Sequence, residues 1–138
     1  MSASKAQRAY LATYIRTLAD GLGLRDWRFH VEKAKRPGAS PGATAASYIR
    51  WNDDHSAVWF SDEALEGSAE DLRETVIHEL LHCHMERVDV LVIDALKRYV
   101  PRDTWRTFSS AWSRESERRI DRIAWAIAEH FPLPDLPK

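Results

Sequence analysis

A helical pattern around residues 72–83 constrains the fold of this chain more than any other feature. Ser68 suits a helix N-cap, and Asp71 occupies the reciprocal position three residues later. At about 100° per residue, the apolar side chains that follow gather on one wide arc. They are Leu72, Val76, Ile77, Leu80, Leu81 and Cys83. This arc predicts a helix that is buried along much of its surface.

Two histidines and a glutamate occupy the strip that the apolar arc leaves free. His78 and His82 are four residues apart, so their imidazoles share one helix face and can converge on a single ion. Glu79 lies beside that face and can reach a water molecule at the metal without binding the metal itself. The alternative is a pair of solvated surface histidines. His84 falls on the far side of the helix, and Cys83 fits a small core residue better than a ligand.

Length and composition narrow the class of protein. The 138 residues predict one domain, residues 1–138, and 44% hydrophobic residues are enough for one core. A formal net charge of −1 argues against nucleic acid as the main partner, because phosphate binding usually shows as a basic excess. The single cysteine excludes an internal disulfide. No secretory signal or membrane-spanning run is recognisable, so we expect a cytoplasmic protein without a membrane partner.

The order of predicted elements indicates an α+β fold. A helix should begin after Ser4, with Gln7 completing a capping box, and end near Gly21. Alternating residues predict a strand over 27–32, and two runs, 44–51 and 55–60, should form a hairpin. The motif helix follows, and a last long helical pattern runs from Asp103 to about His130.

A third metal ligand can be sought on that last helix, because catalytic zinc sites use three protein ligands. Glu117 and Asp121 are four residues apart on a strip beside the apolar face, whereas Glu115 faces roughly the opposite way. Glu117 would complete a His₂Glu set, and Asp121 would orient one of the histidines. The alternative is a pair of surface acids neutralised by neighbouring arginines.

With these residues the chain resembles the gluzincin metallopeptidases, most closely the minigluzincins and related small bacterial and phage proteins. The shared motifs are HELLH at residues 78–82 and ERRID at residues 117–121, which corresponds to the ExxxD of that group. The resemblance implies a zincin-like minimal metallopeptidase fold: an N-terminal helix, a small, mostly antiparallel sheet, the HExxH helix and a C-terminal glutamate helix.

The same resemblance implies a function. It implies one Zn²⁺ per chain, held by His78, His82 and Glu117, with Asp121 in support. Hydrolysis of peptide bonds would use a zinc-bound water activated by Glu79. A peptide or protein substrate would lie extended along the last strand of the sheet, residues 55–60. No residue is assigned by motif to stabilise the oxyanion; Tyr99, His130 and the nearby arginines are the candidates.

Two other functions compete with hydrolysis. One is a non-catalytic zincin-like binding module that keeps zinc for stability and holds a partner on a strand edge. Glu79 favours the enzyme, because a structural site needs no general base. The other is a nucleic-acid-associated protein that uses Arg114, Arg118 and Arg122, although a solvated, salt-bridged surface explains these arginines better. Salt dependence of DNA binding would distinguish it.

Overall fold

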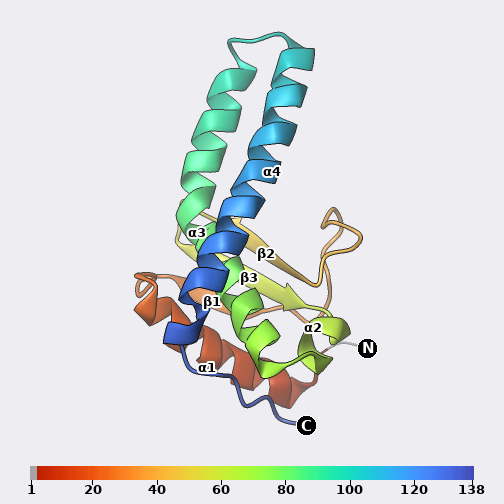
Figure 1. The fold of residues 1–138 in the computed structure, drawn as a ribbon. Coiled ribbons are helices and arrows are strands. Elements are labelled where there is room, and N and C mark those ends of the chain that lie inside the picture. Colours follow the sequence, from red (N-terminus) through yellow and green to blue (C-terminus); the bar gives the residue numbers. More distant parts are fainter. Residues whose placement is uncertain (1–2) are drawn as a thin grey trace.

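Helices and a small sheet follow one another along the described part of the chain, residues 3–138, in the computed structural model (Figure 1). The predicted α+β class is confirmed. The elements are α1 (Lys5–Gly21), β1 (Arg28–Val31), β2 (Ala45–Arg50), β3 (His55–Phe60), α2 (Asp62–Glu66), α3 (Ala69–Lys97), α4 (Arg102–Ile127) and the 3₁₀ turn η1 (Ala128–His130).

The predicted helix starts are confirmed at atomic detail. The Ser4 hydroxyl accepts a hydrogen bond from the Gln7 main-chain N–H at 3.1 Å, and the Gln7 side chain closes the capping box. Ser68 accepts from the Asp71 N–H at 3.1 Å at the start of α3. Helix α2 was not predicted, because its five residues are too few to show a helical period.

The three strands form a mixed sheet in the order β1-β3-β2. β2 and β3 form the predicted antiparallel hairpin, in which Ala45 faces Phe60, while β1 runs parallel to β3. The expectation of a mostly antiparallel sheet is therefore wrong in this respect. The physical reason is that residues 32–44 carry the chain past β1 before the hairpin forms, so β3 inserts between β1 and β2.

This strand order also corrects the expected position of a substrate. Strand β3, residues 55–60, is the central strand, and its main-chain groups pair with β1 on one side and β2 on the other. A paired strand cannot bind an extended peptide along its edge. Within the described sheet, β2 is the strand of the hairpin that keeps a free edge.

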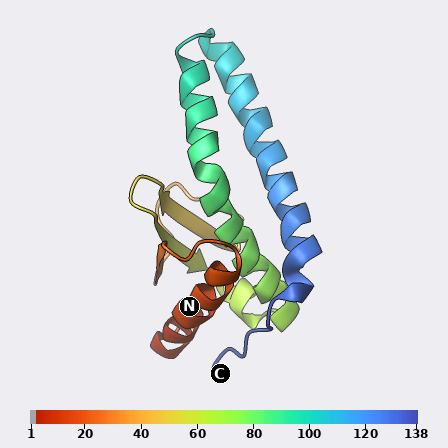
Figure 2. The same ribbon diagram turned by 90° about the vertical axis from the view of Figure 1, so that its left-hand side faces the viewer.

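The core lies where α1 and the first half of α3 pack against the sheet. Leu11, Ile15 and Leu18 of α1 are fully buried. The predicted apolar arc of α3 meets them with Ile77 and Leu80, which are equally buried. The segment after α4 runs back along α1 (Figure 2), where the Tyr14 hydroxyl donates to the Pro132 carbonyl at 2.7 Å.

Helices α3 and α4 continue far beyond this core as an antiparallel pair (Figures 1 and 2). We call residues 84–115 the distal hairpin. The buried residues of α3 end at Cys83 and those of α4 begin at Ser116, so the distal hairpin contains none. Two tryptophans join its helices: Trp112 Nε1 donates to Asp89 Oδ1 at 2.7 Å, and Trp105 Nε1 donates to the Ile93 carbonyl at 3.0 Å.

No helix in residues 3–138 is both long and apolar enough to cross a bilayer.

Candidate metal centre

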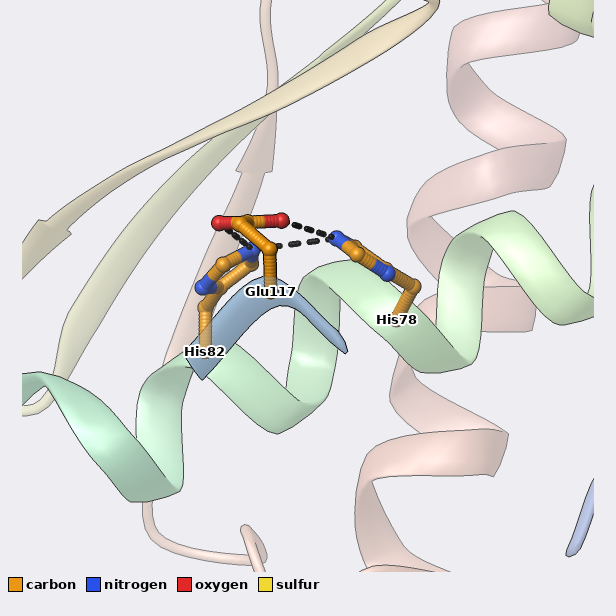
Figure 3. Close-up of side chains that lie close together, drawn as sticks. All are labelled: His78, His82 and Glu117. Atoms are coloured by element: carbon orange, nitrogen blue, oxygen red, sulfur yellow. Dashed lines mark hydrogen bonds and ion pairs between the residues drawn. The ribbon is translucent and has the colours of Figure 1, made fainter. Parts of the chain in front are cut away.

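Helix α4 crosses α3 at the HELLH motif and brings a carboxylate to the two histidines (Figure 3). His78 Nε2 and His82 Nε2 lie 3.1 Å apart. The Glu117 carboxylate spans both rings, with Oε2 at 3.3 Å from His78 Nε2 and Oε1 at 3.5 Å from His82 Nε2. Glu117, which is 35 and 39 positions from the two histidines in sequence, thus presents a third ligand atom at the same point in space.

The spacing of these atoms fits a tetrahedral zinc ion. Ligands about 2.05 Å from such an ion lie about 3.3 Å from one another. The three distances, 3.1, 3.3 and 3.5 Å, scatter around that value. Two imidazoles and one carboxylate are also a donor set that catalytic zinc sites use, with one position left for water. Within residues 3–138 this is the group of side chains with metal-binding geometry.

Asp121 supports the centre from one turn further along α4. Its Oδ1 forms an ion pair with His78 Nδ1 at 2.8 Å. A carboxylate at this nitrogen favours a proton on Nδ1, which would leave the Nε2 lone pair to face a metal. The structure thus brings Asp121 into the supporting position that the sequence predicted.

The charged groups of the centre shift one another's pKa values. Burial lowers the pKa of His78, but the hydrogen bond to Glu117 and the charges of Glu79, Glu117 and Asp121 outweigh it, so the pKa of His78 is raised. The hydrogen bond from His78 is the main reason that the pKa of Glu117 is lowered. His78 and Glu117 thus each favour the charged form of the other, and a metal ion would compete with a proton for the same imidazole.

Glu79 lies beside the three ligands, but its carboxylate is buried. It is only 6% exposed, and burial raises the pKa of its carboxyl group, although the Ser47 hydrogen bond and the two histidines oppose the rise. The Ser47 hydroxyl on β2 donates to Glu79 Oε2 and also lies 3.1 Å from the Glu79 carbonyl oxygen. Ser47 thus fixes the orientation of the carboxylate and ties the motif helix to the sheet.

A groove of about 1160 Å³ contains the centre. Its walls are the loop 37–44, strand β2 and one side of α3, with Glu117 and Asp121 reaching in from α4. Three further carboxylates line it: Asp71, Glu74 and Glu86. No lysine or arginine of residues 3–138 lines the groove, so its surface is strongly acidic.

The other residues considered from the sequence lie away from the groove. Glu115 pairs with Arg118 at 3.3 Å on the exposed side of α4. His84 Nε2 bonds to the Leu22 carbonyl at 2.7 Å, and Cys83 is a buried core residue. Tyr99 is 83% exposed at the tip of the distal hairpin, and His130 follows α4 at the opposite end of that helix. Neither of the two can serve the oxyanion in this arrangement.

Several residues of the groove were not singled out from the sequence, among them Ser47, Tyr48, Glu74 and Glu86. The sequence does contain a pattern that could have identified Ser47. It stands between Ala45 and Ile49 on the inward side of an alternating strand, where a polar residue needs a buried partner. Tyr48 receives the Arg36 N–H on its hydroxyl at 2.9 Å, a contact between the loop and the strand that no sequence pattern predicts.

Comparisons of the chain with models of protein families, with curated proteins and with solved structures gave no match. Function is therefore inferred from the side chains themselves.

Proposed function

We propose that this protein is a zinc-dependent hydrolase of peptide bonds with a zincin-like fold. The observation that carries the proposal is the convergence of His78 Nε2, His82 Nε2 and a Glu117 oxygen at 3.1 to 3.5 Å, with a separate buried carboxylate, Glu79, beside them. Zinc bound by these three residues would lower the pKa of a water molecule and polarise a substrate carbonyl.

Each side chain then has a distinct task. His78, His82 and Glu117 would hold the ion, and Asp121 would orient the His78 ring through the ion pair at 2.8 Å to Nδ1. Glu79 accepts the proton of the attacking water and delivers it to the leaving amine. Burial of Glu79 suits this role, because a raised pKa makes the carboxylate a stronger base and lets it keep the proton until the amine leaves. Ser47 holds the Glu79 carboxylate in place.

Strand β2 is the element best suited to bind the substrate backbone. Its residues 45–49 line the groove along its length, and its outer edge is unpaired within the described sheet. An extended peptide could add to this edge through main-chain hydrogen bonds, which would fix a scissile bond near the centre without requiring one sequence. The acidic lining favours peptides with basic side chains on either side of that bond.

Glu79→Gln tests the proposal. The amide keeps the shape of Glu79 and can still accept the Ser47 hydrogen bond, but it cannot take the proton of water. We expect one equivalent of zinc in both the natural chain and the variant by elemental analysis. Cleavage of an unfolded, fluorescence-quenched protein should be lost only in the variant. Turnover that survives in Glu79→Gln would contradict the assigned base.

A zinc-stabilised binding module is the second candidate. It is favoured by the burial of Glu79, since a carboxylate that is 6% exposed and bonded to Ser47 can also serve as a structural link between α3 and β2. The same measurements separate the two functions. A natural chain that holds zinc but cleaves no member of a broad peptide library supports the module, and a chain that takes up no zinc excludes both.

A further inference from the structure

One face of α3 changes from fully buried to bare along the helix. Ile77 and Leu80 are at most 1% exposed, because α1 and the sheet cover them. Eleven residues make about three helical turns, so Val88 and Leu91 lie on the same face three turns further along. There the exposed fractions are 46% for Val88 and 68% for Leu91. Figures 1 and 2 show the reason: the sheet and α1 stop, and α3 continues.

The exposed face has the spacing of a helix-pairing seam. Val88, Leu91 and Ala95 follow one another at intervals of three and four residues, and all are exposed. We call residues 84–95 of this face the α3 seam. A repeat of three and four is the pattern by which one helix packs along another. An apolar seam on a helix that projects into solvent indicates a partner helix.

The residues that flank the α3 seam identify the partner. On one side lie Arg87 and Asp94, which carry opposite charges seven residues apart. On the other side lie Met85 and Val92, also seven apart and both half-buried. Arg87 stacks over the Trp51 ring at 5.4 Å, and Asp94 is exposed. When two copies of this helix run antiparallel, each flank of one copy therefore meets complementary residues on the same flank of the other copy.

We propose that the α3 seam pairs with the same seam of a second copy of this chain, in antiparallel orientation. When Val88 meets Leu91 of the second copy, the heptad geometry places Arg87 opposite Asp94 of that copy, and Met85 opposite Val92. Two-fold symmetry repeats each pair. A parallel, in-register arrangement would instead place Arg87 beside Val92 of the other copy, so neither Arg87 nor Asp94 would meet an opposite charge.

The antiparallel arrangement also suits the shape of the chain. It places the two sheets at opposite ends of the dimer, since each α3 projects from its own core. The groove lies on a different face of α3, which carries His78, Glu79 and His82, so dimerisation leaves it open.

Sedimentation of the purified full chain over a concentration range tests the pairing. We expect a monomer–dimer equilibrium for the natural chain, and a monomer for Leu91→Glu up to about 100 µM. Leu133→Glu is the matched control, because Leu133 is 48% exposed on the segment after α4, and it should still dimerise. A natural chain that is monomeric up to that concentration, or a Leu133→Glu monomer, would overturn the proposal.

Charge reversal tests the orientation. Arg87→Glu and Asp94→Arg should each weaken the dimer by about tenfold, because each places like charges together twice. The double variant should recover the natural affinity. Single variants with unchanged affinity, or a double variant weaker than both, would exclude the antiparallel seam, and circular dichroism of each variant ensures that only folded chains are compared.

Discussion

The two halves of the α3–α4 pair belong to the same helices but differ in burial and in the metal-ligating residues that they carry. The proximal half, residues 69–83 and 116–127, contains every buried residue of both helices and all the ligands of the candidate centre. The distal hairpin contains no buried residue and no part of the ligand set. The comparison teaches that the ligands converge where α3 is packed against the sheet and has buried residues, and not where the two helices contact only each other.

Loss of Glu117 should have the largest effect on the proximal half. Glu117→Ala leaves two histidines on the metal, so we expect zinc affinity to fall by more than about 100-fold, the upper end of what supporting residues cause. Competition with a chelator of known affinity measures it. Glu115→Ala is the control two residues away, since Glu115 pairs with Arg118 on the exposed side, and it should bind zinc normally. The reverse result would refute the ligand set.

A matched pair of isoleucines measures the difference in packing. Ile120 is 1% exposed in the proximal half, whereas Ile93 is half-buried in the distal hairpin. Ile120→Ala should lower the free energy of unfolding by about 3 kcal/mol, because it leaves a cavity in a closed core. Ile93→Ala should cost about half as much or less. Urea denaturation of both variants gives the values, and equal losses would show that the distal hairpin is as tightly packed as the core.

Asp121→Ala should weaken the centre without dismantling it. The variant removes the carboxylate that lies 2.8 Å from His78 Nδ1, so the ring loses the charge that favours one tautomer and orientation. Zinc affinity or turnover should fall by about 10- to 100-fold. Asp121→Asn should recover part of the loss, because the amide oxygen can still accept a hydrogen bond from Nδ1. An Asp121→Ala chain with unchanged affinity would make this aspartate a surface residue only.

The smallest effect is expected from Ser47→Ala, and it should appear as a shift in pH dependence. The Ser47 hydrogen bond lowers the pKa of Glu79, against the rise caused by burial. Removing it should raise that pKa further. A general base works when deprotonated, so the acid limb of the kcat/KM profile should move to higher pH. Zinc content should stay the same. A limb that moves to lower pH would show that Ser47 does not act on this carboxylate.

Much of the fold was predictable because its signals are local. The caps at Ser4 and Ser68 and the apolar arc of α3 each lie within a few residues of one another, and the structure confirms them. The juxtaposition of Glu117 with the histidines was also predicted, since a long closing helix with an apolar face has few ways to pack. It could be predicted because the helix periods of α3 and α4 place those residues at the border of the core.

The strand order and the Ser47 contact could not be predicted in the same way. A hairpin pattern shows that β2 and β3 pair, but the choice of strand beside β1 depends on packing between segments far apart in sequence. Likewise, the exposed part of the α3 face carries apolar residues, as does the buried part of the same face. Only the length of the sheet and of α1 decides where Leu80 is covered and Leu91 is not.

The division of the ligands between α3 and α4 has a consequence for motion. A cation held by His82 and Glu117 would tie together the two ends of residues 83–116, and so would close a loop that contains the whole distal hairpin. Closing a loop lowers the entropy of the open conformations of everything within it. Hydrogen exchange in the distal hairpin should therefore slow when zinc is added, although no residue there touches the ion. Through that restraint, zinc binding would change the exchange rates of residues far along both helices from the ligands, in the part of the pair that has no buried residues.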